Sequence, residues 1–147
     1  MNKKAFTLLE VLLVIALISI LFVISVVMIN PNKQLGNIND ASRRSDVFAI
    51  YNAINQYRDA NSGNLPDGIN NTPKSICKPD CLSDSDKIDI SEEIEPYIAF
   101  GNIPVDPKQD ESEDITGYTV YVTTEGRVVV AAPIAEMENG TTINTLE

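Results

Sequence analysis

The chain has 147 residues and a formal net charge of −10, from 11 Lys and Arg against 21 Asp and Glu, and it contains no His. The acidic balance argues against nucleic acid as a ligand, because such binding depends on Lys and Arg that neutralise phosphates. The absence of His removes the usual general base and the commonest metal ligand. We therefore expect a protein that is not an enzyme.

The N-terminal region predicts a membrane span. From Phe6 to Ile29 the only ionisable residue is Glu10, and the nineteen residues from Val11 to Ile29 include no charge and no Pro. As a helix they measure about 28 Å, close to the roughly 30 Å hydrocarbon core of a bilayer. Residues 6–29 fit a permanent anchor better than a cleaved signal peptide, whose apolar region is shorter and ends at a small-residue site.

The charges around this span predict its orientation. Lys3 and Lys4 precede it, and the acidic residues 30–147 follow it. The positive-inside rule then leaves the short end in the cytoplasm and exports the head, residues 30–147. Glu10 is costly at the edge of an apolar span, and only Ser19 and Ser25 are polar within it. A partner for the Glu10 carboxylate is expected from outside this segment.

The segment from Lys3 to Glu10, Lys-Lys-Ala-Phe-Thr-Leu-Leu-Glu, followed by an apolar run, resembles the cleavage and methylation signal of the type IV pilin and pseudopilin superfamily. The resemblance implies a leader peptide of residues 1–5, cleavage by a prepilin peptidase between Ala5 and Phe6, and methylation of the Phe6 amine. It also implies that Glu10 pairs with that amine during assembly. Ala5 stands where the family usually has Gly, and the first Pro of the chain is Pro31, after the span.

An amphipathic helix is predicted over about residues 40–61. Its apolar residues recur at spacings of three and four, and Asn39 or Asp40 is placed to cap it. Charged and amide side chains, Arg43 among them, are expected on the other sides. The apolar stripe is Val47, Ile50, Tyr51, Ile54 and Tyr57.

The C-terminal part of the head predicts a small sheet. Residues 117–122 alternate as a strand does, a turn follows, and 127–132 form a second β-rich run, which together predict an antiparallel hairpin over about 117–132. Residues 65–115 are expected to be mainly loop, with one short helix near Ser91 to Phe100. The predicted fold class is α+β, and the resemblance implies one long N-terminal helix packed on an antiparallel sheet.

The two cysteines, Cys77 and Cys81, lie in the exported head, where a disulfide is the leading interpretation. A bridge over so small a loop stabilises by about 2 kcal/mol. Zinc is the alternative, but it needs two further ligands, and no His can provide them.

Five acidic residues cluster before the predicted hairpin. Oxygen-rich loops of this kind hold calcium, although the spacing matches no EF-hand, and the alternative is a solvated acidic loop. Residues 103–107 also resemble a segment of type II secretion major pseudopilins, which bind calcium nearby. The candidate calcium ligands are Asp106, Asp110, Glu111, Glu113 and Asp114.

Together these features predict a structural subunit of a type IV pilus-like filament for adhesion, motility or surface attachment. Its expected partners are further copies of itself, a prepilin peptidase, the assembly machinery and the membrane. We expect an inner-membrane precursor and then an extracellular filament. Two alternatives are a pseudopilin of a secretion or DNA-uptake system and a single-pass anchored binding protein that does not polymerise.

Overall fold

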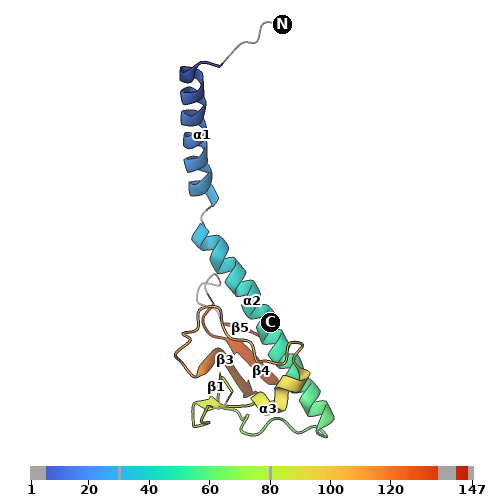
Figure 1. Cartoon of the computed structure of the whole chain (residues 1–147). Coiled ribbons are helices and arrows are strands. Elements are labelled where there is room, and N and C mark those ends of the chain that lie inside the picture. The colour runs from blue at the N-terminus through green and yellow to red at the C-terminus, as the bar shows by residue number, and fades with distance from the viewer. Residues whose placement is uncertain (1–5, 30, 80, 136–141, 146–147) are drawn as a thin grey trace. The chain divides into compact units, whose positions relative to one another are not determined.

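The computed structural model describes residues 6–29, 31–79, 81–135 and 142–145 (Figure 1). The chain divides into two compact units, Met1–Leu35 and Gly36–Glu147. The first unit contains helix α1, Leu8–Ile29. Helix α2, Pro31–Ala60, begins in the first unit and continues in the second, where it is the longest helix among the described residues.

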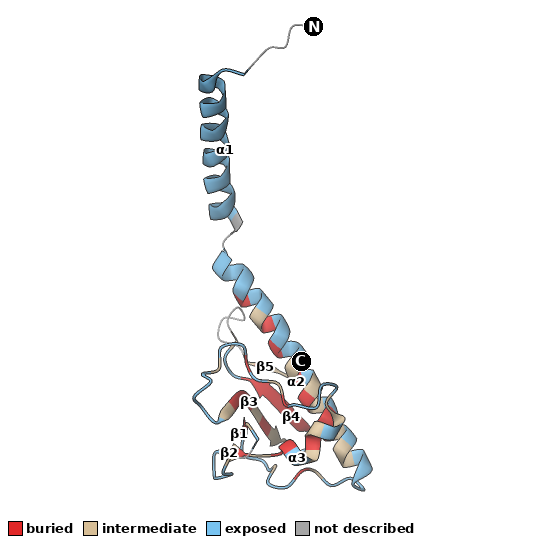
Figure 2. Ribbon diagram, viewed as in Figure 1, coloured by how far each residue is buried: buried red, intermediate tan, exposed pale blue. Residues whose placement is uncertain are grey.

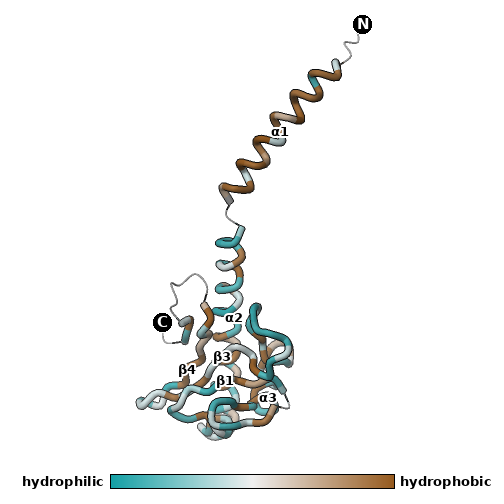
Figure 3. Tube along the Cα trace, turned by 90° about the vertical axis from the view of Figure 1, so that its left-hand side faces the viewer, coloured by the Kyte–Doolittle hydropathy of each residue, from teal (hydrophilic) through white to brown (hydrophobic). Residues whose placement is uncertain are grey.

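Helix α1 is apolar on every side (Figure 3). From Leu8 to Met28 it has the length and composition of a membrane-crossing helix, and no residue of this stretch is buried. The hydroxyls of Ser19 and Ser25 donate to the carbonyls of Ile15 and Leu21, at 2.7 and 2.8 Å. Its two serines are therefore satisfied within the helix, as an apolar environment requires.

Helix α2 begins at Pro31, so the prediction of a start near residue 40 is wrong. Proline is well tolerated in the first turn of a helix, where its missing N–H would have no partner. Asp40, predicted as a cap, instead binds Arg43 one turn further along. The helix ends at Ala60, and the Gly63 N–H then closes on the carbonyl of Arg58 at 2.8 Å.

In the part of the second unit that the structure describes, the sheet has five strands in the order β2-β1-β3-β4-β5. Strands β3 and β4 form an antiparallel hairpin at the place where the alternation predicts one, and β1 pairs antiparallel with β3. Among the described strands, β2 and β1 are the one pair that runs parallel. The strands are β1 (Lys74–Cys77), β2 (Lys87–Ile88), β3 (Ile115–Val122), β4 (Val128–Ala132) and β5 (Ile143–Asn144).

The α+β fold class is thus confirmed, with an apolar N-terminal helix, a second helix and a mostly antiparallel sheet. The expectation that residues 65–115 are mainly loop missed β1 and β2. These strands are too short to show a recognisable alternation. β1 forms against the edge of β3, and β2 then pairs with β1. The same region contains α3, Ser91–Ile94, and the 3₁₀ turn η1, Glu95–Tyr97, inside the range where one short helix is predicted.

The core of the second unit lies between α2 and one face of the sheet (Figure 2). Val47, Ile50 and Ile54 of α2 are fully buried, and they share a cluster with Tyr118 and Val120 of β3. Burying side chains of this size contributes about 1.5–3 kcal/mol each. The predicted stripe of α2 is therefore a packing surface.

Candidate functional site

The start of α1 carries the residues predicted for processing and assembly. Ala5 lies outside the described residues, whereas Phe6 is described and 74% exposed. Thr7 caps the helix, because its Oγ1 accepts the backbone N–H of Glu10 at 3.2 Å. Glu10 thus lies in the first turn, where the helix dipole favours a negative charge.

The exposed side of α2 has a pattern of its own within the second unit. Ile38, Ala41, Ser45, Phe48 and Asn52 are all exposed and follow one another at spacings of four and three. Such spacing places residues on one face of a helix and is typical of helix–helix packing. Ile38 and Phe48 expose 63% and 49% of their surface, and the row itself carries no charge.

The five carboxylates predicted as calcium ligands do not converge. Asp106 is buried and faces Arg43. Asp110 accepts the hydroxyl and the backbone N–H of Ser112, at 2.7 and 2.9 Å. Among the residues that the structure describes, no group of three acidic or cysteine side chains is placed to hold a metal ion. The structure therefore does not bring these five side chains together as one ligand set.

Three further observations describe this loop. Glu113 accepts a hydrogen bond from the side chain of Gln109 at 2.6 Å, and Glu111 and Asp114 are exposed. The ammonium of Lys78 reaches into the loop and binds its backbone carbonyls. A cation of the chain itself therefore lies against the backbone oxygens of residues 110, 111 and 113.

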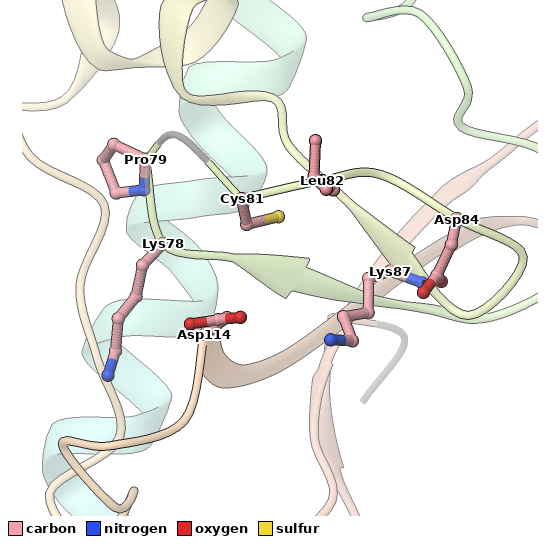
Figure 4. A pocket seen from close by; sticks show the side chains of 7 residues that line it. All are labelled: Lys78, Pro79, Cys81, Leu82, Asp84, Lys87 and Asp114. Carbon is pink, nitrogen blue, oxygen red and sulfur yellow. Dashed lines mark hydrogen bonds between the residues drawn. The ribbon is translucent and has the colours of Figure 1, made fainter.

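Cys77 and Cys81 form a disulfide, and Cys77 is fully buried at the end of β1. The loop that it closes borders a pocket of about 350 Å³ (Figure 4). Two lysines and two aspartates give the pocket a mixed charge. It is lined by Lys78, Pro79, Cys81, Leu82, Asp84, Lys87 and Asp114.

A buried group of charges anchors α2 to the sheet. The guanidinium of Arg43, which has no exposed surface, donates to Asp106 at 2.6 and 2.9 Å and to Asp40 at 2.7 Å. Nearby, the Tyr118 hydroxyl donates to Asp46 at 2.7 Å. Burial raises the pKa of the Asp46 carboxyl, and burial together with this hydrogen bond raises the pKa of Tyr118.

Sequence reasoning placed Arg43 on the polar side of the helix, and this was wrong. The signal that could have found it is the stripe itself, which continues backwards from Val47 through Arg43, Asp40 and Gly36 at spacings of four and three. A charged residue on the apolar face of a helix lies either at a frayed helix end, where solvent reaches it, or in the interior with a partner of opposite charge. Its partner Asp106, 63 residues away, could not be identified from spacing.

Comparison with known proteins identifies only the N-terminus. No curated protein and no solved structure is significantly similar to the chain. Residues 1–26 match the family model of the prokaryotic N-terminal methylation motif. This motif points to a structural protein that is made as a membrane-anchored precursor, and the chain therefore begins with a prepilin-type methylation signal.

Proposed function

We propose that this protein is the structural subunit of a type IV pilus-like filament, cut between Ala5 and Phe6, methylated on Phe6 and polymerised through its N-terminal helix. The observation that carries the proposal is the methylation motif, because it precedes a fully exposed apolar helix. Such a surface is stable in a bilayer or against other apolar helices, but not in water.

Glu10 has a defined role in this proposal. Among the described residues its carboxylate has no ion-pair partner, and cleavage before Phe6 creates an ammonium four residues away in the sequence. Pairing of the two charges, within one chain or between neighbours, removes the penalty of an isolated carboxylate in an apolar setting. Breaking such a buried pair costs about 3–5 kcal/mol, enough to prevent assembly.

The outer row of α2 supports self-association of the head. Copies of a protein with this excess of Asp and Glu repel one another unless the surfaces that meet are neutral or of complementary charge. The row Ile38, Ala41, Ser45, Phe48 and Asn52 is uncharged and has the spacing of a helix-packing seam. We propose that copies of the chain pack along this row in the filament.

The first test is the intact mass and N-terminal sequence of the protein from its native membrane and from sheared surface material. A chain that begins at methylated Phe6 and is recovered in sheared filaments supports the proposal. A chain that begins at Met1 and stays monomeric in the membrane supports the anchored binding protein instead.

Two variants then separate processing from assembly. Glu10→Gln should be processed but should yield few or no filaments. Ser45→Asp adds a negative charge to the outer row of α2 and should also reduce filament yield. Ser62→Asp, which adds the same charge at an exposed position after α2, is the control and should assemble normally. Equal filament yield from Ser45→Asp and Ser62→Asp would contradict the proposed packing row.

A further inference from the structure

The acidic loop before β3 is closed by a lysine from another part of the chain. The Lys78 Nζ lies 3.4 Å from the carbonyl oxygen of Asp110, 3.1 Å from that of Glu111 and 2.5 Å from that of Glu113. An ammonium group has three N–H donors and no acceptor. Three converging carbonyls therefore match its full hydrogen-bonding capacity.

The backbone of Lys78 is fixed on both sides. Its N–H donates to the carbonyl of Asp114 at 2.7 Å, so main chain and side chain hold the same loop. Its carbonyl accepts the N–H of Cys81 at 3.3 Å, inside the ring that the disulfide closes. The side chain thus starts from a constrained turn, which reduces the entropy lost when the ammonium is placed.

The carboxylates of the loop are arranged consistently with this internal cation. The hydroxyl of Ser112, followed by its backbone N–H, lowers the pKa of the Asp110 carboxyl. Glu113 is bound to Gln109, and Asp106 to Arg43. These three carboxylates have partners of their own, and it is the backbone oxygens that face the Lys78 ammonium.

We propose that Lys78 is the built-in counter-cation of the loop from Asp110 to Asp114, and that it orders this loop in place of a bound metal ion. Hard divalent cations are held in proteins by carbonyl and carboxylate oxygens, and here the carbonyls already bind an ammonium. The order of the loop then depends on Lys78 and not on calcium. The inference does not depend on the proposed filament function.

Hydrogen exchange of the full chain in detergent micelles, read on peptides that cover residues 108–116, tests the proposal. Lys78→Met keeps the apolar stem of the side chain but removes the ammonium, and it should speed exchange in these peptides by about tenfold or more. Lys74→Met, which removes an ammonium at the first residue of β1, four positions before Lys78, is the matched control. The turn between β3 and β4 should exchange at the native rate in both variants.

Calcium and its chelator give a second readout on the native chain, which does not require any variant to fold. Neither added Ca²⁺ nor EDTA should change exchange in residues 108–116 by more than the error of the measurement. The proposal is overturned if EDTA speeds exchange in the native chain, or if Lys78→Met exchanges there at the native rate.

Discussion

Arg43 and Asp106 form a two-point ion pair in the interior of the head, with neither side chain exposed to solvent. Arg43 belongs to α2, whereas Asp106 precedes β3, so the pair connects the helix to the segment that leads into the sheet. The Asp106 carboxylate also accepts the backbone N–H of Lys108 at 2.8 Å. The Asp106 carboxylate therefore binds α2 through Arg43 and also stabilises its own turn through the N–H of Lys108.

Removing the Arg43 guanidinium should destabilise the head strongly. Arg43→Met leaves Asp106 buried and without its charged partner, which costs about 3–5 kcal/mol. Arg44→Met, at the exposed neighbouring position, should change stability by less than about 0.5 kcal/mol. Urea unfolding of the full chain in micelles measures both, and similar losses in the two variants would show that the buried pair has no special role.

Gly117 should tolerate no side chain. A Cβ at this position would lie 2.7 Å from the Cβ of Asp106, and its φ of +88° disfavours residues other than Gly. Gly117→Ala therefore combines a clash with backbone strain. Gly126→Ala is the control, since Gly126 has φ of +79° but nothing within 4 Å of the added Cβ. Thermal unfolding measures the loss of stability in both variants. The amount by which the loss in Gly117→Ala exceeds that in Gly126→Ala is due to the contact with Asp106.

Asp46 should give the head a specific pH dependence. Burial raises the pKa of its carboxyl above the ordinary 3.8, so the folded state binds this proton more tightly than the unfolded state. Its stabilising contribution is complete below pH 3.8 and is lost as the pH rises through the raised pKa. Asp46→Asn cannot ionise, so its stability relative to the native chain should increase as the pH rises from 3.8 to neutrality.

Urea midpoints at several pH values test this expectation. Tyr118→Phe is the companion variant, because the Tyr118 hydroxyl donates to Asp46 and lowers its pKa. Without this donor the pKa of Asp46 is higher, so the pH range over which stability changes should extend to higher pH. If the urea midpoints of Asp46→Asn and the native chain change with pH in the same way, the Asp46 carboxyl is not the source of the pH dependence.

Loss of the disulfide should destabilise the head only modestly. Cys77 and Cys81 are four positions apart, and closing so short a loop stabilises by about 2 kcal/mol. The double variant Cys77→Ala and Cys81→Ala should lower the urea midpoint but keep the far-ultraviolet circular dichroism of the native chain. Reduction of the native protein by a thiol should have a similar effect. Loss of the sheet signal in either case would contradict a modest role.

Local pattern was sufficient for several elements of this protein. The uninterrupted apolar run defines α1, and the three-and-four spacing defines the buried stripe of α2. Alternation predicts β3, and a β-rich run after a turn predicts β4. Each of these signals lies within a few turns or strand positions, where side-chain direction follows directly from backbone period. The methylation signal is likewise a contiguous segment at the N-terminus.

Tertiary structure alone decided the remaining features. Arg43 is in the core because Asp106 meets it there. β1 forms against the edge of β3, and β2 pairs with β1. The backbone carbonyls of residues 110, 111 and 113 face Lys78. In each case the two partners are far apart in the sequence, so the residues around one partner do not predict the position of the other. The same holds for the acidic cluster of residues 106–114. The sequence shows how many carboxylates it has, but only packing determines which atoms lie close together.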